Sequence, residues 1–391
     1  MPGLDDFDLD HLRSRPGMKW AVAEPGVLPA WVADMDFPVA PPVRAALQRR
    51  IDSDLGYPIW TDSGKGMPLP EAFADYMARR YGFTPDPAYV REFTDVKQAL
   101  QVILQLATRP GDPVALHVPA YPPFLATLTA MNRPLVPIPM AETDDGWGFD
   151  AERLADDVDR SGCRALLLVN PQNPTGRVFR RAELLRMAEI ALAHDLLVIS
   201  DEIHADLVYE PYAHIPFASL GTEVAERTVT VTSATKAYNI AGLRCAVAHV
   251  GPAGLRRTLA AQPDALFGEI GVLGVEATIA AWRDGDGWLA EVRTVLDRNR
   301  HRIVQALPPG VACRPPEATY LAWLDCRPLG IGPDPAEFFL KEARVLLAGG
   351  PPFGPGGAGF ARLNFATSEP VLEEILTRMR DAVARRAAQP S

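Results

Sequence analysis

The middle of the chain alternates short apolar runs with longer amphipathic stretches. Residues 164–169 (RALLLV) and 196–200 (LLVIS) are typical of buried strands, and residues 180–194 between them place apolar side chains at helical spacing. Further strands are expected at 228–231 and 245–250. This β-α-β chaining predicts an α/β fold with a mostly parallel sheet flanked by helices.

The pattern changes after residue 284. A long helix is expected at 288–307, followed by a proline-rich turn and a strand-like piece at 320–324. A chain of 391 residues, 48% of them hydrophobic, is long enough to bury two cores. We therefore expect a large domain at 41–284 and a smaller α+β domain formed by 1–40 together with 285–391.

The composition argues against several classes of function. A net charge of −10 without a basic stripe disfavours a nucleic-acid partner. No apolar run approaches the roughly 20 residues needed to cross a bilayer, so no membrane partner is expected. The acidic start of the chain lacks the apolar segment of a secretory signal, which predicts a cytoplasmic protein. The four cysteines show no C-x-x-C spacing, which disfavours metal sites and disulfides.

Three polar segments begin where predicted strands end, namely 170–176 (NPQNPTG), 201–204 (DEIH) and 233–236 (SATK). Ligands of open α/β sheets bind outside the carboxyl ends of the strands, so these segments are expected to face one crevice. The spacing of the acids and the histidine in DEIH matches no usual metal-ligand set.

Lys236 stands out because lysine occurs at only five positions in the chain. It follows Ser233 and Thr235, and Arg244 lies eight positions later. A lysine that carries pyridoxal phosphate as a Schiff base needs such hydroxyls and a cation nearby to hold the phosphate. The alternative is that Lys236 is an exposed charge on a surface loop.

Asp201, Asn173 and Tyr121 could hold the ring of such a cofactor. A carboxylate next to a buried strand is costly without a cation, and a protonated pyridine nitrogen would supply one; Asp201 could instead cap a helix. Two prolines and a glycine make the turn around Asn173 rigid, which would aim its amide at the cofactor's phenolate oxygen. Tyr121 could stack on the ring or serve as a packing residue.

Two further segments could bind anions. Residues 94–100 (TDVKQAL) lead into a helix expected at 99–107, whose first backbone N–H groups could cradle a phosphate. Arg362 lies in a strand-like alternation at 360–366 and could clamp a substrate carboxylate through two hydrogen bonds. The alternative for Arg362 is a surface salt bridge.

With these residues in place, the chain resembles the fold-type I pyridoxal-phosphate enzymes, the aspartate aminotransferase superfamily, over nearly its whole length. Residues 31–37 (WVADMDF) and 201–207 (DEIHADL) resemble the MalY/PatB-like branch of cystathionine β-lyases and cysteine-S-conjugate β-lyases. The resemblance implies the fold of these transferases, a pyridoxal 5'-phosphate cofactor, and a homodimer with shared active sites.

The resemblance also implies individual roles. Lys236, Asp201 and Tyr121 would be the catalytic residues, with Lys236 forming the Schiff base and removing the substrate's α-proton. Tyr57 would reach the phosphate of the neighbouring subunit. The substrate contacts would be Ala33, Asn173 and Arg362, and the remaining cofactor contacts would be Val96, Lys97, Tyr121, Asn173, Asp201, His204, Ser233, Thr235 and Arg244.

The implied reaction is elimination from L-cystathionine or a cysteine S-conjugate, which gives a thiol, pyruvate and ammonia. Transamination uses the same residues, and decarboxylation or oxidative deamination of an amino-acid conjugate is open on this scaffold. A regulatory cofactor-binding protein is a lesser alternative. Two positions depart from the family pattern. Asp95 stands where many relatives have glycine, so it should point away from the phosphate or pair with Lys97, and Pro122 replaces a second tyrosine.

Overall fold

The computed structural model describes residues 3–5, 7, 9–57, 59, 66–144 and 146–388. Its largest element is an eight-stranded sheet in the order β2-β9-β8-β7-β6-β3-β4-β5. The strands are β2 (Val90–Phe93), β3 (Val114–Val118), β4 (Leu135–Thr143), β5 (Gly146–Phe149), β6 (Ala165–Val169), β7 (Leu197–Asp201), β8 (Thr228–Thr232) and β9 (Ala246–Val250). Strands β8, β7, β6, β3 and β4 run parallel to one another, which confirms the predicted mostly parallel sheet.

Strand β9 differs from the expected chaining. The apolar run at 245–250 forms a strand, but this strand is antiparallel to both β8 and β2. The connection from β8 to β9 contains only the short turn η5 (Ala241–Leu243) and no crossover helix. Parallel neighbours are usually joined by a crossover that contains a helix, and the antiparallel return of β9 agrees with the lack of one here.

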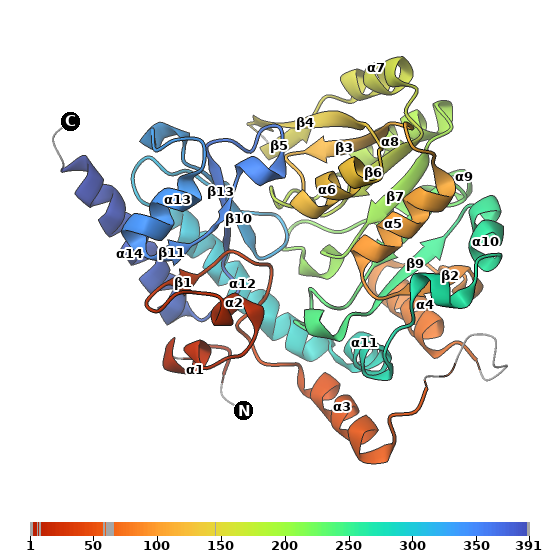
Figure 1. The fold of residues 1–391 in the computed structure, drawn as a ribbon, viewed down its shortest axis with the longest axis horizontal. Helices are drawn as coiled ribbons and strands as arrows, with labels where there is room; N and C mark the ends of the chain where they lie inside the picture. Colours follow the sequence, from red (N-terminus) through yellow and green to blue (C-terminus); the bar gives the residue numbers. More distant parts are fainter. Residues whose placement is uncertain are drawn as a thin grey trace.

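Helices cover both faces of the large sheet (Figure 1). One face packs against α5 (Val96–Ala107), α6 (Pro122–Ala130) and α10 (Ala253–Ala260). The other face packs against α7 (Ala151–Ser161), α8 (Arg181–Ala193) and α9 (Thr222–Ala225). The side chains of β6 alternate between the two, since Leu167 and Val169 join the first core and Leu166 and Leu168 the second. Buried on both faces, these strands have to be apolar throughout.

A third core unites the N-terminal and C-terminal parts of the chain. Strands β10 (Leu321–Asp325), β13 (Phe360–Asn364) and β12 (Ala348–Gly349) form an antiparallel sheet, and β1 (Leu28–Pro29) pairs in parallel with β11 (Val345–Leu346). The helices of this region are α1 (Leu9–Arg13), α2 (Met18–Ala21), α3 (Pro41–Ser53), α4 (Pro68–Tyr81), α11 (Val272–Asp284), α12 (Asp286–Ala306), α13 (Pro335–Phe338) and α14 (Glu369–Ala387). In Figure 1 the N-terminal segment lies against the C-terminal elements.

The third core runs across the expected boundary near residue 284, because it includes residues of α4, α11 and α12. The division into domains therefore stays a prediction. The further short 3-10 turns are η2 (Pro87–Tyr89), η3 (Ala205–Leu207), η4 (Phe217–Leu220), η6 (Asp264–Phe267), η7 (Arg327–Leu329) and η9 (Pro351–Phe353), and η8 (Phe339–Ala343) is a short π-helix. None of the helices in the described ranges is long and apolar enough to cross a membrane.

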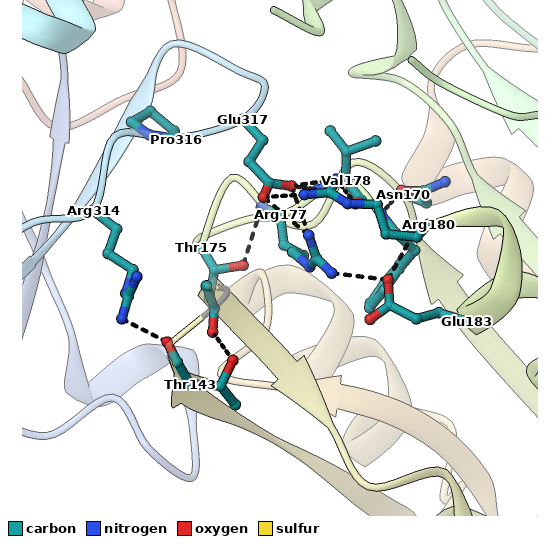
Figure 2. A network of polar contacts seen from close by, with 12 residues as sticks. Thr143, Asn170, Thr175, Arg177, Val178, Arg180, Glu183, Arg314, Pro316 and Glu317 are labelled. Atoms are coloured by element: carbon teal, nitrogen blue, oxygen red, sulfur yellow. Dashed lines mark hydrogen bonds and ion pairs between the residues drawn. The ribbon is translucent and has the colours of Figure 1, made fainter. Parts of the chain in front are cut away.

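A buried ionic clasp holds the segment before β10 on the loop that follows β6 (Figure 2). The Glu317 carboxylate accepts hydrogen bonds from Arg177 at 2.9 and 3.1 Å, from Arg180 at 2.7 and 3.0 Å, and from the Val178 N–H at 2.8 Å. The backbone N–H groups of Glu317 and Ala318 both donate to Gly176 O at 3.0 Å. The clasp thus fixes the loop that carries Asn173.

We expect Glu317→Ala to lower the free energy of unfolding by about 3 kcal/mol, because it leaves the buried Arg177 guanidinium without its main partner. Denaturant titration measures this loss. Glu189→Ala is the matched control, since Glu189 pairs with Arg186 on the surface and its loss should cost less than about 1 kcal/mol. Equal losses in the two variants would show that Glu317 contributes no more than a surface pair.

Candidate active site

A cavity of about 160 Å³ opens at the carboxyl edge of the parallel strands. The loops after β6, β7 and β8 all reach it, as the strand ends predict, and so does the first turn of α5. Most of the predicted site residues line this cavity: Ala33, Val96, Lys97, Tyr121, Asn173, Asp201, His204, Thr235, Lys236 and Arg244. The remaining lining residues are Thr94, Asp95, Phe124, Val169, Ile203, Ala241 and Cys245.

The Lys236 amine lies inside the cavity and donates to the Ala33 carbonyl oxygen at 2.7 Å. The pKa of Lys236 is lowered to about 8, chiefly by burial and also by the positive charges of Arg362 and Lys97, while the Asp34 carboxylate opposes the shift. The interpretation of Lys236 as an exposed surface charge is therefore wrong. A lysine with this pKa is about one tenth neutral at pH 7, far more than an ordinary lysine, and both covalent attachment and proton abstraction require the neutral amine.

Asp201 is the last residue of β7 and is 4% exposed. Its side chain accepts a hydrogen bond from the Ile203 N–H at 3.1 Å, and it has no ion pair within the described ranges. Burial raises the pKa of Asp201 to about 7, an effect that Glu202 reinforces and the Ile203 N–H opposes. The carboxylate caps no α-helix, and its surroundings favour a cationic partner inside the cavity.

His204 and Tyr121 supply ring surfaces. The Nδ1 atom of His204 is buried and accepts or donates no hydrogen bond among the described residues. Burial and the nearby Lys236 and Arg362 lower the pKa of His204 to about 3, so the imidazole is neutral. Tyr121 precedes α6, and Pro122 opens that helix at a position where proline is favoured.

Arg362 lies on β13 and is 5% exposed. It donates to Asn173 Oδ1 at 2.9 Å and to Trp31 O at 3.1 Å, and its buried Nε has no partner within the part of the chain that the structure describes. Burial lowers the pKa of Arg362 to about 10. The surface salt bridge considered for Arg362 is therefore wrong, and its environment favours an incoming carboxylate. Because Arg362 occupies Asn173 Oδ1, the Asn173 NH2 group is left to donate.

The anion-binding end of the cavity is the first turn of α5. The helix begins at Val96, three residues before the expected start, because the Asp95 carboxylate caps it by accepting from the Gln98 N–H at 2.8 Å. The N–H groups of Val96 and Lys97 then point out of the helix end and are free to bind an anion. Asp95 neither turns away nor pairs with Lys97, since it forms an ion pair with Arg244.

Three predicted residues lie outside the cavity lining, namely Ser233, Tyr57 and Arg362, of which Arg362 still hydrogen-bonds to the lining residue Asn173. The Ser233 hydroxyl donates to Cys245 O at 2.5 Å and its oxygen lies 2.8 Å from Thr235 Oγ1, so it supports the loop and is not part of the cavity lining. Tyr57 is 79% exposed on the segment after α3. In Figure 1 α3 lies at the lower edge of the molecule, next to α11.

Several supporting residues were not predicted. Asn239 and Asn364 hold residues 32–37 over the cavity, because Asn239 Nδ2 donates to Met35 O and Phe37 O and Asn364 Nδ2 donates to Val32 O and Asp34 O. Tyr320 donates to Ala33 O at 3.0 Å. Both asparagines lie within three positions of a predicted site residue, Lys236 or Arg362, but a sequence does not tell which distant backbone an amide will hold.

These residues fit pyridoxal 5'-phosphate. The cavity offers an amine with a lowered pKa, a buried carboxylate without a cationic partner among the described residues, aromatic surfaces, and a helix N-terminus for the phosphate. The Nε of Arg362, which has no partner in the described part of the chain, suits a substrate carboxylate. Within the described ranges, no group of three His, Cys, Asp or Glu residues could hold a metal ion.

Comparison with known proteins agrees with this fit to pyridoxal 5'-phosphate. Residues 40–379 match the family model of aminotransferase class I and II. The cystathionine beta-lyase PatB of Bacillus subtilis is 34% identical over 91% of this chain and 92% of its own length. The cystathionine beta-lyase of Corynebacterium glutamicum is 33% identical, over 95% and 98%. The crystal structure of a pyridoxal-phosphate-bound C-S lyase from Staphylococcus hominis has a TM-score of 0.89 and 29% identity, and covers 98% of this chain and 99% of its own.

Because Asp201 is buried, we expect the protein without a bound small molecule to lose stability as the pH rises. Its pKa is raised in the folded state, so its contribution to stability is complete below the ordinary value of 3.8 and is lost as the pH rises through about 7. At pH 8 the free energy of unfolding of Asp201→Asn should therefore exceed that of the wild type by about 2 kcal/mol or more, which thermal unfolding measures as a higher melting temperature. At pH 4 the two proteins should have nearly the same stability. The exposed Asp156→Asn is the control. An unchanged difference between pH 4 and pH 8 would contradict the assignment.

Proposed function

The chain belongs to the aminotransferase class I and II family, and on this basis we propose that it is a pyridoxal 5'-phosphate-dependent carbon–sulfur lyase. Its substrate is L-cystathionine or another cysteine S-conjugate, and its products are a thiol, pyruvate and ammonia. The observation that carries this proposal is the position of the Lys236 amine, with its lowered pKa, in a cavity that also contains the Asp201 carboxylate, which has no ion pair among the described residues.

The cofactor would be held at both ends by residues of this cavity. Asp201 would pair with the pyridine nitrogen, Asn173 would donate to the phenolate oxygen, and Tyr121 and His204 would contact the ring. The first turn of α5, Thr235 and Arg244 would face the phosphate. When bound, pyridoxal 5'-phosphate supplies an aldehyde that joins amines and a cationic ring that accepts the electron pair left when a bond to the substrate's α-carbon breaks.

The protein's own residues would then orient the substrate and move its protons. Arg362 would bind the substrate carboxylate with its fork of donors, which fixes the α-carbon relative to Lys236. Lys236 would take the α-proton at Nζ, because its pKa leaves part of it neutral near pH 7. The protonated Nζ could then deliver that proton to the departing sulfur, so that the thiol leaves neutral.

The test is to incubate the purified protein with L-cystathionine in the absence of any keto acid. We expect pyruvate and free thiol to be released. Conversion only when a keto acid is added would show that the protein is an aminotransferase and would contradict the lyase proposal. Lys236→Ala should lose the activity by about a thousandfold or more, because the general base is removed. Lys341→Ala, which changes a lysine whose side chain is 83% exposed, should keep it.

We also propose that the protein is a homodimer with shared active sites. Tyr57 supports this, because it is exposed in the single chain and does not line the chain's own cavity. Its phenol would reach the phosphate end of the neighbouring subunit's site. A cytoplasmic location and the absence of a nucleic-acid partner stay predictions.

Shared sites can be tested by mixing two defective variants. Tyr57→Ala and Lys236→Ala should each be weakly active alone, since each lacks one component of every site. A hybrid dimer has one site with both defects and one intact site, so co-refolded equal amounts should recover about a quarter of the wild-type activity. Activity that never exceeds the sum of the separate variants would contradict shared sites, and so would full activity of Tyr57→Ala alone.

A further inference from the structure

Asp95 has two roles at the phosphate end of the cavity. Its Oδ1 atom caps α5 by accepting from the Gln98 N–H at 2.8 Å. Its Oδ2 atom forms an ion pair with the Arg244 guanidinium. Both residues line the cavity together with Thr94, Val96 and Lys97. The cap holds the Asp95 carboxylate at the end of the helix, where Arg244 reaches it.

The backbone conformation of Arg244 also restricts where its side chain can point. It follows the short turn η5 in the left-handed conformation, with φ at +53°, and its side chain is 55% exposed. Asp95 is its only ion-pair or hydrogen-bond partner in the described part of the chain. The guanidinium therefore reaches across the cavity edge to the helix cap, and its charge is already balanced by a carboxylate.

Lys97 stands in contrast to Arg244. It also lines the cavity, and within the described ranges it forms no ion pair. A phosphate dianion at the first turn of α5 would meet the N–H groups of Val96 and Lys97, the uncompensated Lys97 ammonium, and an arginine neutralised by Asp95.

We propose that Asp95 competes with the cofactor's phosphate for Arg244, and that Lys97 is the cation on which phosphate binding mainly depends. The proposal rests on the proposed cofactor site. Phosphate binding at this end must either break the Asp95–Arg244 pair or share Arg244 with it, and both options reduce the free energy gained. The protein therefore holds the phosphate group more weakly than the number of its cations indicates, and Asp95 is the residue that sets this weakening.

Asp95→Asn tests the competition, because asparagine caps a helix as well as aspartate does but carries no charge. The full-length chain is freed of cofactor, and its binding of inorganic phosphate and of pyridoxal 5'-phosphate is measured by calorimetry at fixed low ionic strength. We expect both ligands to bind about three- to tenfold more tightly to the variant than to the wild type. Unchanged or weaker binding overturns the proposal.

A double-mutant cycle tests whether Asp95 acts through Arg244. In the Arg244→Gln background, Asp95→Asn should tighten phosphate binding by less than about twofold, because the arginine it would release is gone. An undiminished gain would show simple repulsion and would overturn the competition. With Asp95 intact, Lys97→Gln should weaken binding more than Arg244→Gln does; the reverse order overturns the assignment of Lys97.

Asp150→Asn is the matched control. Asp150 caps α7 in the same way, by accepting from the Arg153 N–H at 3.0 Å, and it lies outside the cavity lining. Its change should leave phosphate binding unaltered. These measurements need no catalytic turnover, so failure of the lyase proposal stays distinguishable. If the wild type binds no pyridoxal 5'-phosphate, the cofactor site itself is wrong; if it binds and Asp95→Asn changes nothing, only this inference fails.

Discussion

The removal of charged groups from water at the carboxyl edge of the sheet is the constraint on which the site depends. Asp201, Lys236 and Arg362 are each shifted toward their neutral forms because the surrounding fold buries them with few partners. Such burial lowers the stability of the protein alone and is offset when ligands of opposite charge bind. The strands around these groups keep their side chains from turning back to solvent. The folded protein without ligand therefore retains the free-energy cost of burying them.

The loop that carries Asn173 connects this edge to the rest of the molecule. Glu317 fixes the loop from one side through Arg177 and Arg180, and Arg362 binds the Asn173 amide from the other. Gly176 allows this approach, since a Cβ there would lie 2.4 Å from Pro316 Cβ. Asn173, which faces the proposed cofactor, and Arg362, which faces the proposed substrate, are thereby held in one network. A shift of either side chain would move the other.

The sequence predicted the parallel strands and most of the cavity lining, because doubly buried strands are apolar throughout and polar loops follow where they end. It did not indicate the direction of β9, since an apolar run has no direction. The start of α5 was placed three residues late because the Asp95 cap was not recognised. Ser233 was placed in the site for its hydroxyl, which the fold uses to hold Cys245 O. Tyr320, Asn239 and Asn364 act on backbone far away in the chain, and no local pattern indicates such partners.

The Ala33 carbonyl, which receives both Lys236 and Tyr320, has a consequence for how the protein is made. Ala33 is synthesised well before Asn364, which holds its neighbours Val32 and Asp34. The carbonyl groups around Ala33 therefore stay hydrated by water until the segment around Asn364 has been made and has folded. A nascent chain that has completed its large sheet still has an unfinished site.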